Sequence, residues 1–80
     1  MAIKRVRFTF PEDRIQEPLI YRLGQEFPVV TNIRMADVDE KTGWVLLELE
    51  GDPSEIDRSI VWAQQKGVRV DPVAGDIVEG

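Results

Sequence analysis

The sequence predicts an α+β domain in which four strands and two helices follow one another in the order β-α-β-β-α-β. Apolar and polar residues alternate in segments 3–10, 29–38 and 44–50, as in strands buried on one face. Two intervening segments that begin near a proline repeat apolar residues at helical spacing. With 80 residues and no linker between elements, the chain is expected to form one domain over 1–80.

The first strand and the first helix are predicted from residues 3–10 and 18–27. Pro18 suits the first turn of a helix, where its missing N–H costs nothing. Gly24 lies beside the apolar stripe, and a glycine inside a helix indicates close packing against the sheet. The residues expected to face the core are Val6, Phe8 and Phe10 on the strand and Leu19, Ile20, Leu23 and Phe27 on the helix.

The second and third strands are predicted on either side of a turn at 39–43. In the second strand, the alternation assigns Val29, Thr31, Ile33 and Met35 to the core face and Val30, Asn32, Arg34, Ala36 and Val38 to the other face. In the third strand, Val45, Leu47 and Leu49 are expected inside and Trp44, Leu46, Glu48 and Glu50 outside.

The second helix has clear predicted ends. Asp52 is expected as the N-cap, Pro53 as the first helical residue, and Glu55 as the partner of Asp52 in a capping box. Gly67 is the expected left-handed cap at the other end. The inward stripe comprises Ile56, Ser59, Ile60, Trp62 and Ala63, and a short last strand places Val68 and Val70 inward.

Two right-handed crossovers put both helices on one face of a four-stranded antiparallel sheet. This is the ferredoxin-like βαββαβ arrangement with strand order 4-1-3-2, in which the second strand forms an edge. Its core is expected over about residues 3–73, followed by a loose C-terminal tail. The face without helices would expose Trp44, Leu46 and the arginines Arg5, Arg7, Arg34 and Arg69, an apolar patch with a polar rim.

Composition narrows the function. The net charge of −5 disfavours a protein that binds nucleic-acid backbones, and Phe8 and Phe10 face the core instead of offering rings to RNA bases. The chain has no cysteine and no histidine, which removes thiolate metal ligands and the commonest general base. No phosphate-binding glycine motif is present. We expect no catalytic residue, no metal site, no cofactor and no nucleic-acid partner.

No apolar run approaches the length of a membrane span, and no signal-peptide pattern opens the chain. A cytoplasmic protein without membrane insertion is therefore expected. Two interpretations of the open face stay open at this point. Trp44 and Leu46 either fill an exposed sheet or form an interface, and Asn32 and Arg34 either face solvent or contact a ligand.

Several segments together resemble the NIL domain family. They are "PLIYRLGQEF" at 18–27, "VTNIRMADV" at 30–38 and "LEGDPSEIDRSIVWAQQKGVRVDPV" at 49–73. The family's Asn-Ile-Leu motif matches Asn32 and Ile33, whereas Arg34 stands where the family has leucine. The resemblance covers nearly the whole chain.

The resemblance implies a regulatory domain. NIL domains occur at the C-terminus of ATP-binding subunits of bacterial methionine importers, where they pair as dimers and bind methionine. They also occur fused to ferredoxin modules and as free-standing proteins, and this chain is expected to be free-standing. The resemblance implies that Asn32 contacts the ligand, and with its neighbours the expected ligand-binding residues are Asn32, Ile33, Arg34 and Met35. The apolar patch of the open face gives the expected interface residues Ala36, Val38, Trp44 and Leu46.

Two functions follow as hypotheses. The first is a homodimer that binds an amino acid, such as methionine, at the subunit interface. The alternative is an adaptor without a small ligand, which pairs its open sheet face or edge strand with another protein.

Overall fold

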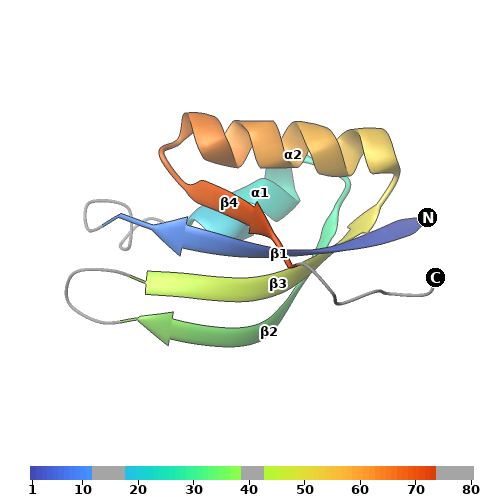
Figure 1. The fold of residues 1–80 in the computed structure, drawn as a ribbon. Helices are drawn as coiled ribbons and strands as arrows, with labels where there is room; N and C mark the ends of the chain where they lie inside the picture. The colour runs from blue at the N-terminus through green and yellow to red at the C-terminus, as the bar shows by residue number, and fades with distance from the viewer. Residues whose placement is uncertain (12–17, 39–42, 74–80) are drawn as a thin grey trace.

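The computed structural model describes residues 1–11, 18–38 and 43–73, so the expected tail lies outside the described residues. The elements occur in the predicted order: β1 (Ala2–Phe10), α1 (Leu19–Glu26), β2 (Val30–Val38), β3 (Gly43–Gly51), α2 (Pro53–Gln65) and β4 (Arg69–Pro72). The sheet has the order β2-β3-β1-β4, the predicted order counted from the other edge. Both helices cover one face of this antiparallel sheet (Figure 1), which confirms the ferredoxin-like fold.

The core lies between the sheet and the helices, as the apolar alternation predicts. Phe8 on β1 and Leu47 and Leu49 on β3 are completely buried, and Ile56 of α2 packs over them. The rings of Phe8 and Phe10 meet edge to face with centroids 6.1 Å apart. The buried apolar residues are Val6, Phe8, Phe10, Leu19, Leu23, Val29, Val45, Leu47, Leu49, Ile56, Ala63 and Val68.

The helix ends agree with the sequence in part. Pro18 is the N-cap of α1, so it precedes the first helical turn in which it was predicted. Its carbonyl oxygen accepts a hydrogen bond from the Arg22 N–H. Asp52 and Pro53 start α2 as expected. The capping box does not form, because the Asp52 side chain makes no hydrogen bond to a backbone N–H of the first turn. The Asp52 carboxylate instead accepts a hydrogen bond from the Ser54 hydroxyl.

α2 ends just before Gly67, the residue predicted to form its left-handed cap. Gly67 has a φ of 92°, which a residue with a Cβ adopts only at a cost. The N–H of Val68 donates to the Ala63 carbonyl and that of Gly67 to the Gln64 carbonyl, which forms a Schellman motif. This motif turns the chain sharply from α2 into β4.

The close packing predicted at Gly24 is absent, and replacing it with alanine is expected to stabilise the domain. Gly24 is exposed, and an added Cβ would lie 3.9 Å from the Val29 carbonyl oxygen, an ordinary contact. We expect Gly24→Ala to raise the free energy of unfolding by about 0.5–1 kcal/mol through helix propensity. Urea denaturation measures this change.

Gly51 is the matched control for that substitution. A Cβ there would approach the Pro28 carbonyl oxygen to 3.0 Å, so the backbone must shift to accept it. Gly51→Ala should therefore lower the free energy of unfolding. A stability loss in Gly24→Ala would instead show that α1 needs a glycine at that position.

Candidate functional site

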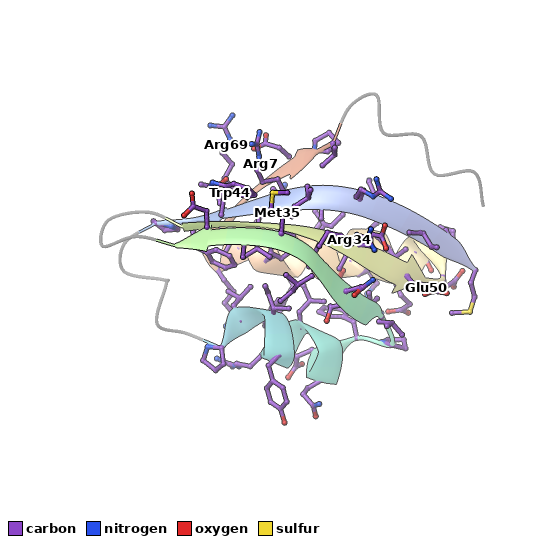
Figure 2. All side chains as sticks on the ribbon, turned by 90° about the horizontal axis from the view of Figure 1, so that it is seen from below. Arg7, Arg34, Met35, Trp44, Glu50 and Arg69 are labelled. Atoms are coloured by element: carbon purple, nitrogen blue, oxygen red, sulfur yellow. The ribbon has the colours of Figure 1, made fainter. Side chains whose placement is uncertain are left out.

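The open face of the sheet consists of side chains that the strand register aligns in four rows. The rows, read across the sheet from β4 or β1 to β2, are Arg69–Thr9–Trp44–Asp37, Asp71–Arg7–Leu46–Met35, Arg5–Glu48–Asn32 and Ile3–Glu50–Val30. Figure 2 views this face and shows Arg7, Trp44 and Met35 gathered together, with Arg34 further along the sheet. The prediction that the arginines of β1 share a face with Trp44 and Leu46 is confirmed.

A β-bulge in β2 changes which side chains reach this face. The pairing of β2 with β3 shifts register between Ile33 and Met35. Met35 therefore lies opposite Leu46 on the open face, and its predicted core position is wrong. An extra residue in one strand reverses the alternation beyond it, which a strict two-residue period does not anticipate.

The bulge and the edge position of β2 also change the expected surroundings of Ala36 and Ile33. Ala36 lies opposite the buried Val45 and so belongs to the side of the sheet that carries the helices, not to the open face. Ile33 lies opposite Leu47 on the predicted side, but 54% of it is exposed because β2 is an edge strand. Val38 pairs with Gly43 in the backbone, and its side chain lies outside the described structure.

Asn32 belongs to a polar network on the open face. Glu48 Oε2 accepts hydrogen bonds from Arg5 Nη2 at 2.7 Å and Arg5 Nε at 3.0 Å. Glu48 Oε1 faces the Asn32 Nδ2 at 3.5 Å, a weak hydrogen bond. Since the Asn32 amide nitrogen points to Glu48, its carbonyl oxygen can accept a hydrogen bond from a ligand.

A hollow of about 450 Å³ opens beside this network. It is lined by Arg7, Met35, Trp44, Leu46, Pro72 and Val73. A second hollow of about 240 Å³ is lined by Arg5, Arg34, Met35 and Leu46. Because both share Met35 and Leu46, we treat them as one trough, called the open-face trough below. The larger volume is in the range of small-molecule sites.

The structure brings together only some of the residues predicted for the site. The predicted residues that line the trough are Arg34, Met35, Trp44 and Leu46. Asn32 lies in the adjoining row, whereas Ile33 and Ala36 lie on the other side of the sheet. The trough is also lined by four residues that were not predicted for the site, Arg5, Arg7, Pro72 and Val73. The alternation of β1 placed Arg7 on this face, but no local signal placed the end of β4 beside it.

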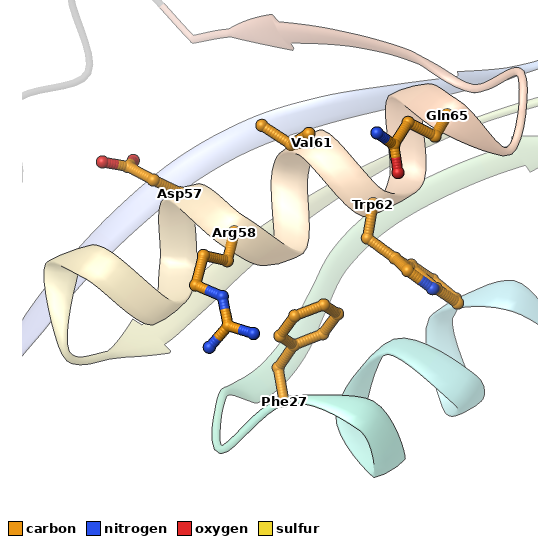
Figure 3. Close-up of a pocket in the computed structure, with 6 residues that line it drawn as sticks. All are labelled: Phe27, Asp57, Arg58, Val61, Trp62 and Gln65. Carbon is orange, nitrogen blue, oxygen red and sulfur yellow. The ribbon is translucent and has the colours of Figure 1, made fainter.

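A different hollow, of about 370 Å³, lies on the outside of the helices and is lined by Phe27, Asp57, Arg58, Val61, Trp62 and Gln65 (Figure 3). The rings of Phe27 and Trp62 meet edge to face at 6.0 Å. The Arg58 guanidinium lies 5.6 Å from the Phe27 ring centre and the Lys66 ammonium 5.4 Å from that of Trp62. Cationic side chains of the protein thus already lie over the faces of these rings. The open-face trough is therefore the stronger candidate for a ligand site.

In the three described stretches of the chain, no helix is long and apolar enough to cross a membrane.

Comparison with known proteins identifies the family. The model of the NIL domain matches residues 4–72. Two relatives are called methionine import ATP-binding protein MetN. The one from Mannheimia succiniciproducens is 29% identical over 70 residues, covering 82% of this chain and 20% of the relative. The one from Lacticaseibacillus paracasei is 26% identical over 72 residues, covering 85% and 21%. The chain thus spans about a fifth of the length of these relatives.

A solved structure shows the same fold. It is the C-terminal domain of an ABC transporter ATP-binding protein from Enterococcus faecalis, with a TM-score of 0.78 and 21% identity. The match covers 91% of this chain and 86% of that domain. Since the family model spans most of the chain, from the first strand to the last, this chain belongs to the NIL domain family.

Proposed function

We propose that this domain is a regulatory module that binds a small amino-acid ligand at the interface of a homodimer. The observation that carries the proposal is the open-face trough, where Arg34, Met35, Trp44 and Leu46 surround a hollow beside Asn32. The relatives are named for methionine import, so L-methionine is the first ligand to test.

The trough offers groups that match the side chain and the carboxylate of an amino acid. Met35, Trp44 and Leu46 form an apolar wall for a thioether or aliphatic side chain. The Arg34 guanidinium can bind a carboxylate with two parallel hydrogen bonds. Asn32 contributes amide hydrogen bonds from the adjoining row.

The edge strand β2 supports the homodimer. Among the strands that the structure describes it pairs with β3 alone, and along it Val30, Ile33 and Met35 are 59%, 54% and 58% exposed. An exposed apolar edge strand is a template for pairing with a second chain. In this arrangement Ile33 and Ala36 contact the second copy on the helix side, and Trp44 and Leu46 contact it on the open face.

A ligand held between two copies stabilises the dimer by mass action. Regulation follows if the dimer with ligand and the dimer without it differ in affinity for a partner domain, because a ligand shifts an equilibrium only by its differential affinity. The proposal places this module in the cytoplasm, alongside an ATP-binding partner.

The substitution Asn32→Ala tests the site. In the unchanged protein, L-methionine at a hundred times its dissociation constant should stabilise the fold by about 2.7 kcal/mol. We expect Asn32→Ala to lose this stabilisation, because the amide contacts are gone, while the stability without ligand changes little at an exposed position. Thermal unfolding with and without ligand, together with calorimetric titration, measures both.

Gln25→Ala is the control, since Gln25 is an exposed amide on α1, in the other layer of the fold. It should respond to ligand as the unchanged protein does. If Asn32→Ala also retains the full response, Asn32 is not part of the site.

The exposed apolar side chains of β2 also favour a second function, an adaptor that adds a strand of another protein to this edge. A panel of amino acids separates the two functions. Saturable binding of one of them supports the ligand-binding module. A folded protein that binds none supports the adaptor.

A further inference from the structure

We infer that the open-face trough selects a carboxylate anion with an apolar body and no free ammonium group over a zwitterionic amino acid. This inference rests on the proposed function, in which the trough holds a small ligand, and it names the charge of that ligand. It is carried by the arginines that line the trough and by the carboxylates that are already paired around it.

The charges lining the trough are all positive. The two hollows are lined by Arg5, Arg7 and Arg34 and by no acidic side chain. The open face also carries Asp37 and Glu50, which line neither hollow. Two other carboxylates of this face are engaged by arginines. Glu48 is bound by Arg5 at 2.7 Å, and Asp71 by the Arg69 Nε at 3.0 Å. The trough therefore carries positive charge within a protein whose formal net charge is −5.

Arg7 and Arg34 are the arginines available to a ligand. Both are exposed, and neither forms a hydrogen bond or ion pair with any other described residue. They lie in different hollows that share Met35 and Leu46, so an apolar body between them has a guanidinium at either end. Figure 2 shows Arg7 and Arg34 on the same face with Met35 between them.

No acidic side chain of the described residues lines either hollow, so an ammonium group in the trough has no carboxylate in direct contact. The Asn32 carbonyl oxygen is a neutral acceptor, and the adjacent Glu48 carboxylate is already paired with Arg5. Two unpaired guanidinium groups repel an ammonium, whereas each attracts a carboxylate. In a zwitterion, the carboxylate is attracted to these guanidinium groups and the ammonium is repelled by them. A ligand with a carboxylate and no ammonium has only the attraction.

A matched pair of ligands tests this inference. L-methionine and 4-(methylthio)butanoate share the thioether chain and the carboxylate and differ only in the α-ammonium group. We expect 4-(methylthio)butanoate to bind at least about tenfold more tightly than L-methionine in calorimetric titrations at low ionic strength. Added salt should reduce this preference, because it screens exposed charges.

Arg34→Leu and Arg7→Leu test the assigned residues. Each removes a guanidinium and keeps an apolar side chain, so each should reduce the preference for the anion, and the double variant should abolish it. Arg22→Leu is the control, because Arg22 is an exposed arginine on α1, in the other layer. Circular dichroism confirms that each variant folds.

The outcomes separate this inference from the proposed function. If L-methionine binds as tightly as 4-(methylthio)butanoate or more tightly, the inference is overturned while the proposed function stands. If the anion is preferred but Arg7→Leu and Arg34→Leu keep that preference, the assigned residues are wrong and the inference is overturned. If neither compound nor any amino acid of the panel binds, both fail.

Discussion

Replacing Phe8 with alanine is expected to lower the free energy of unfolding by about 3–5 kcal/mol. Phe8 is completely buried on a central strand, between Val45 of β3 and Val70 of β4 in the register. The substitution removes a large apolar surface and the edge-to-face contact with Phe10. A domain of this size has a total stability of about 4–12 kcal/mol, so at least about a quarter of it would be lost.

Urea denaturation followed by tryptophan fluorescence measures this loss at a fixed protein concentration. Ile3→Ala is the control on the same strand, since 38% of Ile3 is exposed and little packing is lost there. We expect it to cost about 1 kcal/mol or less. A similarly small cost for Phe8→Ala would contradict the position of Phe8 in the core.

Trp44→Ala is expected to weaken the proposed homodimer by roughly thirtyfold or more while leaving the fold intact. Trp44 is half-buried on the open face and lines the trough beside Met35. Tryptophans at the centre of interfaces commonly contribute about 2 kcal/mol or more to association. Sedimentation equilibrium over a dilution series measures the dimer, and circular dichroism measures the fold.

Tyr21→Ala is the matched aromatic control. Tyr21 is 67% exposed on α1, in the layer away from the open face, so its removal should leave the dimer unchanged. An unchanged dimer in Trp44→Ala would place the interface elsewhere. Both proposed functions predict that Trp44→Ala weakens association, but only the ligand-binding module predicts that it also reduces a saturable response to amino acids.

The element order and the sheet topology were predictable from the sequence because they rest on local signals. Apolar alternation identified the strands, and the buried Phe8, Leu47 and Leu49 all occupy predicted core positions. Glycine chemistry identified the end of α2 at Gly67. Given the element order, right-handed crossovers leave few topologies, and β2 lies at the predicted edge.

Details of the helix ends were less predictable. The motif beginning at Asp52 predicted the start of α2, but its carboxylate binds the Ser54 hydroxyl instead of a backbone N–H. Gly24 indicated close packing that the structure does not contain. Local motifs locate such residues along the chain, but the partner of each side chain depends on which groups surround it in three dimensions.

The composition of the trough was decided by tertiary structure. The bulge after Ile33 turns Met35 onto the open face beside Arg34, and strand pairing brings Arg7 next to it. The end of β4 then completes the wall with Pro72 and Val73. The sequence by itself determined the fold and the chemistry of the open face. Which of these groups surround one cavity depends on long-range register, because a bulge forms in the pairing of two strands and leaves no trace in the alternation of either one.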